Sequence, residues 1–176
     1  MVRVGTWIEA RPTLHIPGLI DSRKDECHIT MVYLGDIDPE EVVSVLKGNT
    51  DGWGSAMPYE TILCEAHGTA RWMNADGDHV DVILVSPPIP KIGHHTIYTE
   101  RDRLLTRLRG GKVEVDDLYP FVPHITIPGG WPADPKQMLW TIKARTMFAI
   151  DKLYVSYTER DGKGVKATKH IEITKG

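Results

Sequence analysis

The tripeptide His-Ile-Thr occurs twice, at residues 28–30 and 124–126, within the runs CHITMVYLGD and VPHITIPGG. Both runs are rich in apolar and β-branched residues, which favours β-strands. Side chains alternate between the two faces of a strand, so His28 and Thr30 are expected to share one face, as are His124 and Thr126. The isoleucine between them would pack into the core. Each strand is therefore predicted to present an imidazole and a hydroxyl side by side.

Two such strands facing each other would bring two imidazoles and two hydroxyls into one cleft. Histidine titrates near neutral pH, so one ring can take a proton from water or a ribose hydroxyl while the other gives a proton to a leaving oxygen. The hydroxyls of Thr30 and Thr126 can donate to the non-bridging oxygens of a phosphate and stabilise charge there. This design suits phosphodiester cleavage and requires no metal. The alternative is a pair of exposed or hydrogen-bonded strand histidines without a catalytic role.

The looser pattern His-x-Thr also occurs at His67 and His94, so that pattern alone is weak. At His67 the middle residue is glycine, which cannot pack into a core, and the pattern at His94 directly precedes an expected helix. We interpret His67, His94 and His95 as structural. A metal centre built from His94, His95 and carboxylates is an alternative, but the spacing matches no familiar set of metal ligands.

The elements that must position the motifs are strands interspersed with helices. Hydrophobic patterns predict strands over 3–10, 27–34, 59–73, 79–86, 122–128, 148–159 and 165–174. Capping signals and amphipathic spacing predict helices over 38–49 and 99–111 and a short helix over 134–142. Residues 11–26 read as a proline-containing arm, and the turns at 74–78 and 161–164 predict hairpins. This order predicts an α+β fold with mostly antiparallel sheets.

The sequence after each motif also repeats. Asp38 follows His28 by ten residues, Asp134 follows His124 by ten, and each aspartate precedes a proline and the start of an expected helix. A Glu or Gln at the third helical position completes a capping pattern in both places. We infer an internal duplication that gives two lobes related by a pseudo-two-fold axis, with helices on the outer faces and a central cleft. The alternative is chance, because Asp-Pro is a common helix start.

Composition and charge limit the class of protein. The chain has 176 residues, which fits a single domain over 1–176, and its net charge of −3 argues against a surface that coats duplex DNA. No apolar run is long enough to span a membrane, and the N-terminal residues lack the apolar stretch of a secretory signal. The two cysteines, Cys27 and Cys64, are expected to be reduced thiols, with a single disulfide between them as the alternative. We expect a cytoplasmic monomer without a membrane partner.

At its two motifs the sequence resembles the 2H phosphoesterase superfamily, which is named for paired H-x-[ST] motifs. HITMVYLG is similar to the first motif of that family and PHITI to the second, and the length and order of elements fit over nearly the whole chain. The resemblance implies that His28 and His124 form the acid/base pair and that Thr30 and Thr126 bind the phosphate. The family often has a helix between its first strand and first motif, where this chain has the arm over 11–26.

Known branches of the family act on 2',3'-cyclic ends, RNA 3' ends, 2'-5' linkages or cyclic oligonucleotides, and the compact chain looks like a phage or bacterial member. A nucleotide substrate also needs an aromatic surface on which a base can stack. Trp7, Trp72 and Trp131 are candidates for this role, with core packing as the alternative for each. Tyr33 has the wrong strand parity to join the face of His28 unless a bulge intervenes.

The sequence therefore predicts a metal-independent phosphodiesterase that hydrolyses a cyclic or 2'-5'-linked nucleotide or oligonucleotide, without a cofactor. The alternative is a module that binds a nucleotide or an RNA end in the same cleft without cleaving it, because histidine and threonine also make good phosphate ligands. The sequence does not assign the acid and base roles to individual histidines.

Overall fold

The computed structural model describes residues 2–16, 19–22, 24–48, 61–74, 76–89, 95–130 and 145–174. The helices and strands of this part of the chain follow the predicted order closely. Their bounds are β1 Val2–Pro12, β2 His15–Ile16, β3 Ile20–Asp21, β4 Ile29–Gly35, α1 Pro39–Lys47, β5 Ile62–Met73, β6 His79–Ser86, α2 Ile97–Gly110, β7 His124–Thr126, β8 Thr146–Arg160 and β9 Lys166–Glu172. The α+β prediction is confirmed.

A single antiparallel sheet joins most of the strands, in the order β4-β1-β8-β5-β6-β7, with β9 also paired to β8. The long strand β8 holds the sheet together. One of its edges pairs with β1, while β5 and β9 share the other edge, β5 over residues 146–150 and β9 over residues 154–160. Residues of β8 thus connect the strand that precedes the first motif to the strands that precede the second.

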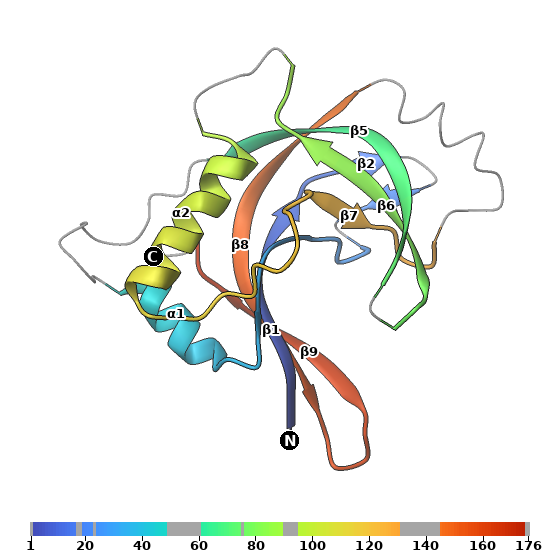
Figure 1. The fold of residues 1–176 in the computed structure, drawn as a ribbon. Coiled ribbons are helices and arrows are strands. Elements are labelled where there is room, and N and C mark those ends of the chain that lie inside the picture. Colours follow the sequence, from blue (N-terminus) through green and yellow to red (C-terminus); the bar gives the residue numbers. More distant parts are fainter. Residues whose placement is uncertain are drawn as a thin grey trace.

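The sheet curls strongly, as Figure 1 shows. Its two end strands, β4 and β7, contact each other although they are not paired. The concave arrangement therefore brings together two segments that are almost a hundred residues apart in the chain. Because these segments carry the His-Ile-Thr motifs, the curvature of the sheet positions the candidate site.

The two described helices pack against each other beside the sheet (Figure 1). In α1, Asp38 is the N-cap and accepts a hydrogen bond from the Glu40 amide, and Gly48 is the C-cap, as predicted. Helix α2 begins two residues before the predicted range, because Thr96 and Thr99 form a reciprocal capping box. The helix predicted over 134–142, with its cap at Asp134, lies outside the described residues.

The arm over 11–26 differs from the prediction of a plain loop. It folds into a small antiparallel hairpin in which His15 pairs with Asp21 and Ile16 with Ile20. Both isoleucines are buried, so the hairpin contributes to the core. Cys27 and Cys64 are buried and free, which confirms unpaired thiols. No helix among the described residues is both long and apolar enough to cross a membrane. The two-lobed layout stays a prediction.

Candidate active site

The two His-Ile-Thr motifs lie on the strands at the two ends of the sheet. His28 directly precedes β4, which contains Thr30, while His124 and Thr126 form the ends of β7. The isoleucine of each motif is fully buried, whereas its histidine and threonine remain at least partly exposed. The expected alternation of faces is therefore present at both motifs.

Two pockets lie beside the motifs, and each is lined by the histidine of one motif and the threonine of the other. A pocket of about 330 Å³ is lined by His28 and Thr126. A larger pocket of about 840 Å³ is lined by His124 and Thr30. Each pocket thus joins a residue of one motif to a residue of the other.

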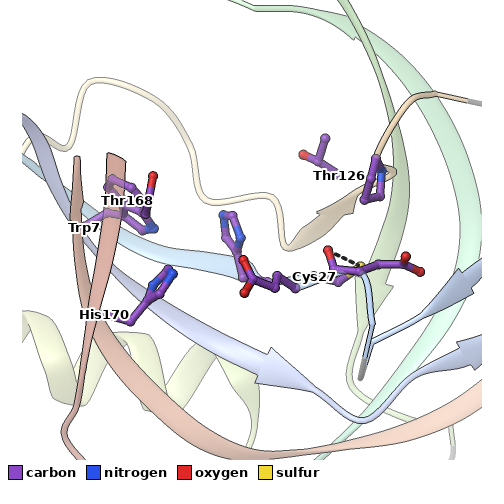
Figure 2. A pocket seen from close by; sticks show the side chains of 9 residues that line it. Trp7, Cys27, Thr126, Thr168 and His170 are labelled. Atoms are coloured by element: carbon purple, nitrogen blue, oxygen red, sulfur yellow. Dashed lines mark hydrogen bonds between the residues drawn. The ribbon is translucent and has the colours of Figure 1, made fainter. Parts of the chain in front are cut away.

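The smaller pocket has walls from several strands. Figure 2 shows Trp7, Thr168 and His170 on one side and Thr126 on the opposite side. Thr168 and His170 belong to β9, and the sequence analysis did not single them out. The remaining lining residues come from the segment before β4 and the turn after β7: Asp25, Glu26, Cys27, His28 and Pro128.

His124 is oriented by the backbone. Its Nδ1 lies 2.8 Å from the carbonyl oxygen of Val122. A carbonyl can only accept, so Nδ1 carries the hydrogen and the Nε2 of the neutral ring is left as a proton acceptor. Burial lowers the pKa of His124, and the hydrogen bond to Val122 partly opposes this effect. A neutral imidazole with a basic Nε2 at ordinary pH has the properties of a general base.

His28 is oriented by a carboxylate. Its Nδ1 lies 3.4 Å from Oε2 of Glu9, a residue of β1 that is fully buried. Burial lowers the pKa of His28, whereas the charge of Glu9 acts in the opposite direction. Glu9 is surrounded by three further polar side chains that the sequence analysis also missed: Arg11, Ser156 and His170.

Solved structures with a similar arrangement of elements match almost the whole chain. E. coli LigT, in complex with 3'-AMP, superposes with a TM-score of 0.53 at 11% identity, covering 98% of this chain and 99% of that chain. TT0787 of Thermus thermophilus gives a TM-score of 0.54 at 13% identity, covering 97% and 98%. A structure described as a phosphoesterase gives 0.52 at 12% identity, covering 98% and 99%. The chain has the 2H phosphoesterase fold. No protein-family model matches the sequence, and no curated protein matches it significantly.

In this 2H phosphoesterase fold, two of the three predicted tryptophans lie beside the motif histidines. The ring centroids of Trp7 and His28 are 6.3 Å apart, and Trp7 lines the smaller pocket. Trp72 lines the larger pocket, with its ring centroid 4.3 Å from that of His124. Both are half-buried and accessible from a pocket rather than enclosed in the core. Trp131 lies outside the described residues.

A bulge in β4 brings Tyr33 to the larger pocket. Glu9 pairs with Thr30 and Ile8 pairs with Val32, so Met31 is an extra residue in the ladder between β1 and β4. Such a residue reverses the alternation beyond it. Tyr33 therefore shares the pocket with Thr30 although the two residues are three positions apart.

The larger pocket of this protein is mainly aromatic and apolar on the side formed by residues 112–122. The guanidinium carbon of Arg101 lies over the ring of Phe121, 4.8 Å from the ring centroid. Arg101 also forms an ion pair with Asp117. Arg101 and Phe121 both line this pocket. The other lining residues are Met31, Val32, Met73, Asn74, Asp116, Tyr119, Pro120 and Val122.

The other histidines considered in the sequence have different surroundings. His67 is exposed at a bulge in β5 and lines neither pocket. His95 pairs with the buried Glu100 at 2.7 Å, and Arg103 pairs with the same carboxylate. His94 lies outside the described residues. Within the described ranges, no group of three or more His, Cys, Asp or Glu side chains is placed to hold a metal ion.

Proposed function

We propose that this protein is a metal-independent phosphodiesterase that hydrolyses a cyclic or 2'-5'-linked nucleotide by two-histidine acid/base catalysis. The observation that carries the proposal is the crosswise lining of two pockets, one by His28 and Thr126 and the other by His124 and Thr30. A phosphate between the two motifs would have an imidazole and a hydroxyl on either side. E. coli LigT, which has the same fold, was solved with the nucleotide 3'-AMP, in keeping with a nucleotide ligand here.

The reaction needs one proton to be taken and one to be given. One histidine accepts the proton of the attacking hydroxyl or water as its oxygen forms the new P–O bond. The other histidine donates a proton to the leaving oxygen as the old P–O bond breaks. The hydroxyls of Thr30 and Thr126 donate to the non-bridging oxygens, where negative charge increases in the transition state. Exchange with solvent then restores the starting protonation of the pair.

In this proposal, the aromatic residues at the two pockets bind the nucleotide bases by stacking. We assign Trp72 to a base in the larger pocket and Trp7 to a group in the smaller one, because each lies beside a motif histidine. We further propose that Trp131 has a similar role, because it follows the second motif by five residues. Stacking tolerates different bases, so the phosphodiester linkage would determine specificity.

The test is product analysis by HPLC and ³¹P NMR in EDTA, with His28→Ala, His124→Ala and wild-type protein. The panel contains 2',3'-cyclic mononucleotides, 2'-5' oligoadenylate, and 3'-5' cyclic di- and trinucleotides. Loss of a general acid or base should reduce the rate by about 10²–10⁴-fold. His67→Ala is the matched control, because this exposed imidazole lines neither pocket and its loss should leave the rate unchanged.

Three outcomes are informative. Cleavage of one class that both motif variants abolish would support the proposal and identify the linkage. Full activity of both variants would exclude two-histidine catalysis. Measurable affinity of the wild-type protein without turnover of any compound would favour a nucleotide-binding module that uses the same pockets.

A further inference from the structure

Each motif histidine has a backbone hydrogen bond to the residue two positions before it, and His28 has a carboxylate partner in addition. The Nδ1 of His124 faces a neutral carbonyl, that of Val122. The Nδ1 of His28 faces a carboxylate oxygen of Glu9. A carboxylate stabilises an imidazolium much more than a carbonyl does, because the interaction is between opposite charges in a poorly solvated place. The pair is therefore electrostatically asymmetric despite the repeated motif.

Glu9 is held on one of its two oxygens. Oε1 accepts a short hydrogen bond from the Ser156 hydroxyl and lies 3.0 Å from Nδ1 of His170. These contacts come from β8 and β9, where Ser156 and His170 are paired in register. They hold the Glu9 carboxylate from β8 and β9.

The second oxygen, Oε2, is directed toward His28 but has no well-aligned donor among the described residues. The Nε of Arg11 lies 3.0 Å away and forms an ion pair without the angle of a hydrogen bond. The Nδ1 of His28 is 3.4 Å away. A fully buried carboxylate oxygen without a hydrogen bond costs free energy. A nearby donor that can reach hydrogen-bonding geometry with this oxygen is therefore favoured. Hydrogen bonds of this kind are often long in an unliganded site and shorten in the reactive complex.

We propose that Glu9 is a positioning residue that fixes Nδ1–H of His28 and stabilises its cation, which makes His28 the general acid and His124 the general base. This assignment rests on the proposed function. In the cleavage step, Nε2–H of His28 gives its proton to the leaving oxygen as the P–O bond breaks. Nε2 of His124 takes the proton of the nucleophile as the new P–O bond forms.

The groups around His28 act on its pKa in both directions. Asp25 and Glu26 precede it in the same segment and line the pocket, and Arg11 and His170 face it from β1 and β9. Burial lowers the pKa of His28 most, and Glu9 is the largest influence in the opposite direction. A backbone hydrogen bond to Glu26 also raises the pKa, whereas Arg11 and His170 lower it further. Removal of the Glu9 charge would therefore leave mainly influences that disfavour the cation.

The first test follows the protons directly by ¹⁵N NMR of histidine-labelled full-length protein. In the wild type, the neutral form of His28 should be the Nδ1–H tautomer. In Glu9→Gln, His28 should titrate at a lower pH while His124 is unchanged. Glu65→Gln is the matched control, because Glu65 is also buried in the sheet but pairs with Arg145 and lines neither pocket. The Glu65→Gln change should shift the pKa of neither His28 nor His124.

A wild-type His28 in the Nε2–H tautomer would overturn the proposal, and this result needs no variant and no substrate. An unchanged pKa of His28 in a folded Glu9→Gln protein would overturn it as well. Because neither measurement depends on turnover, failure of the positioning role can be distinguished from failure of the proposed function.

The second test is the pH profile of kcat for Glu9→Gln. The acid must be protonated, so a lower pKa of His28 should move the alkaline limb to lower pH and leave the acidic limb, set by His124, in place. On the alkaline side, kcat should fall about tenfold for each pKa unit lost, since the protonated fraction falls tenfold. KM should change little. A fall in kcat with both limbs unmoved would indicate a merely structural role, and movement of the acidic limb alone would reverse the assignment.

Discussion

Trp72 lies edge-on to His124, with ring centroids 4.3 Å apart and ring planes inclined at 69°. The indole comes from β5 and the imidazole from β7, on either side of β6 in the sheet. Trp72 and His124 both line the larger pocket. The tryptophan therefore contacts the histidine and is open to the larger pocket at the same time.

Trp72→Ala is expected to weaken substrate binding. Stacking of one base contributes about 1–3 kcal/mol, which corresponds to about 5- to 150-fold in Kd. Calorimetry with the inactive His28→Ala protein as background would measure this loss without turnover. Trp72→Phe should retain most of the affinity, and Met147→Ala, an exposed apolar change on β8, should retain all of it. Equal affinity of the Trp72→Ala protein would exclude the stacking role.

Gly111→Ala is expected to destabilise the packing of α2 on α1. A Cβ atom at this C-cap would lie 2.7 Å from Cγ2 of Val45, although the backbone there has an ordinary negative φ. Overpacking of this kind costs about 1–3 kcal/mol. Urea unfolding would measure the loss, and Val45→Ala should restore much of it in the double variant by removing the overlapping methyl groups. If the two changes were additive, the overlap would not be the cause.

The stability of the protein should depend on pH through His124. Burial lowers its pKa from 6.5, so below about that pH the unfolded chain binds a proton more readily than the folded chain does. The free energy of unfolding therefore loses a contribution as pH falls from 6.5 toward the folded pKa. Urea unfolding at about pH 7.5 and about pH 5.5 gives the change in the free energy of unfolding between the two conditions. This free energy should fall less for His124→Gln than for the wild type. An equal fall in the free energy of unfolding for the two proteins would contradict a lowered pKa of His124 in the folded state.

Much of the fold follows from local patterns in the sequence. The alternation at His28–Thr30 and His124–Thr126 was predictable because strand parity has a period of two, and the N-cap at Asp38 because the capping pattern is local. The hairpin inside the arm was missed, since two-residue strands leave almost no periodic signal.

The missed site residues depend on pairing between distant strands. Glu9 and His170 are 161 residues apart and meet only because β1 and β9 both pair with β8. Neither residue has a spacing that distinguishes it from a charged residue on an exposed strand face. Strict alternation places Tyr33 on the wrong face unless a bulge intervenes, and the extra residue at Met31 is such a bulge. Register and bulges are tertiary properties, and a single sequence specifies them weakly.

The crosswise sharing of the pockets has a consequence for any attempt to divide the chain. A fragment that ends after α1 would keep His28 and Thr30, and a fragment that begins at β5 would keep His124 and Thr126. Each fragment would contribute one wall to both pockets and complete neither. Both pockets would be completed only when the fragments reassemble through the ladder between β1 and β8. If the proposed hydrolysis is correct, the fold would be suited to a split reporter in which turnover signals that two fused partners have met.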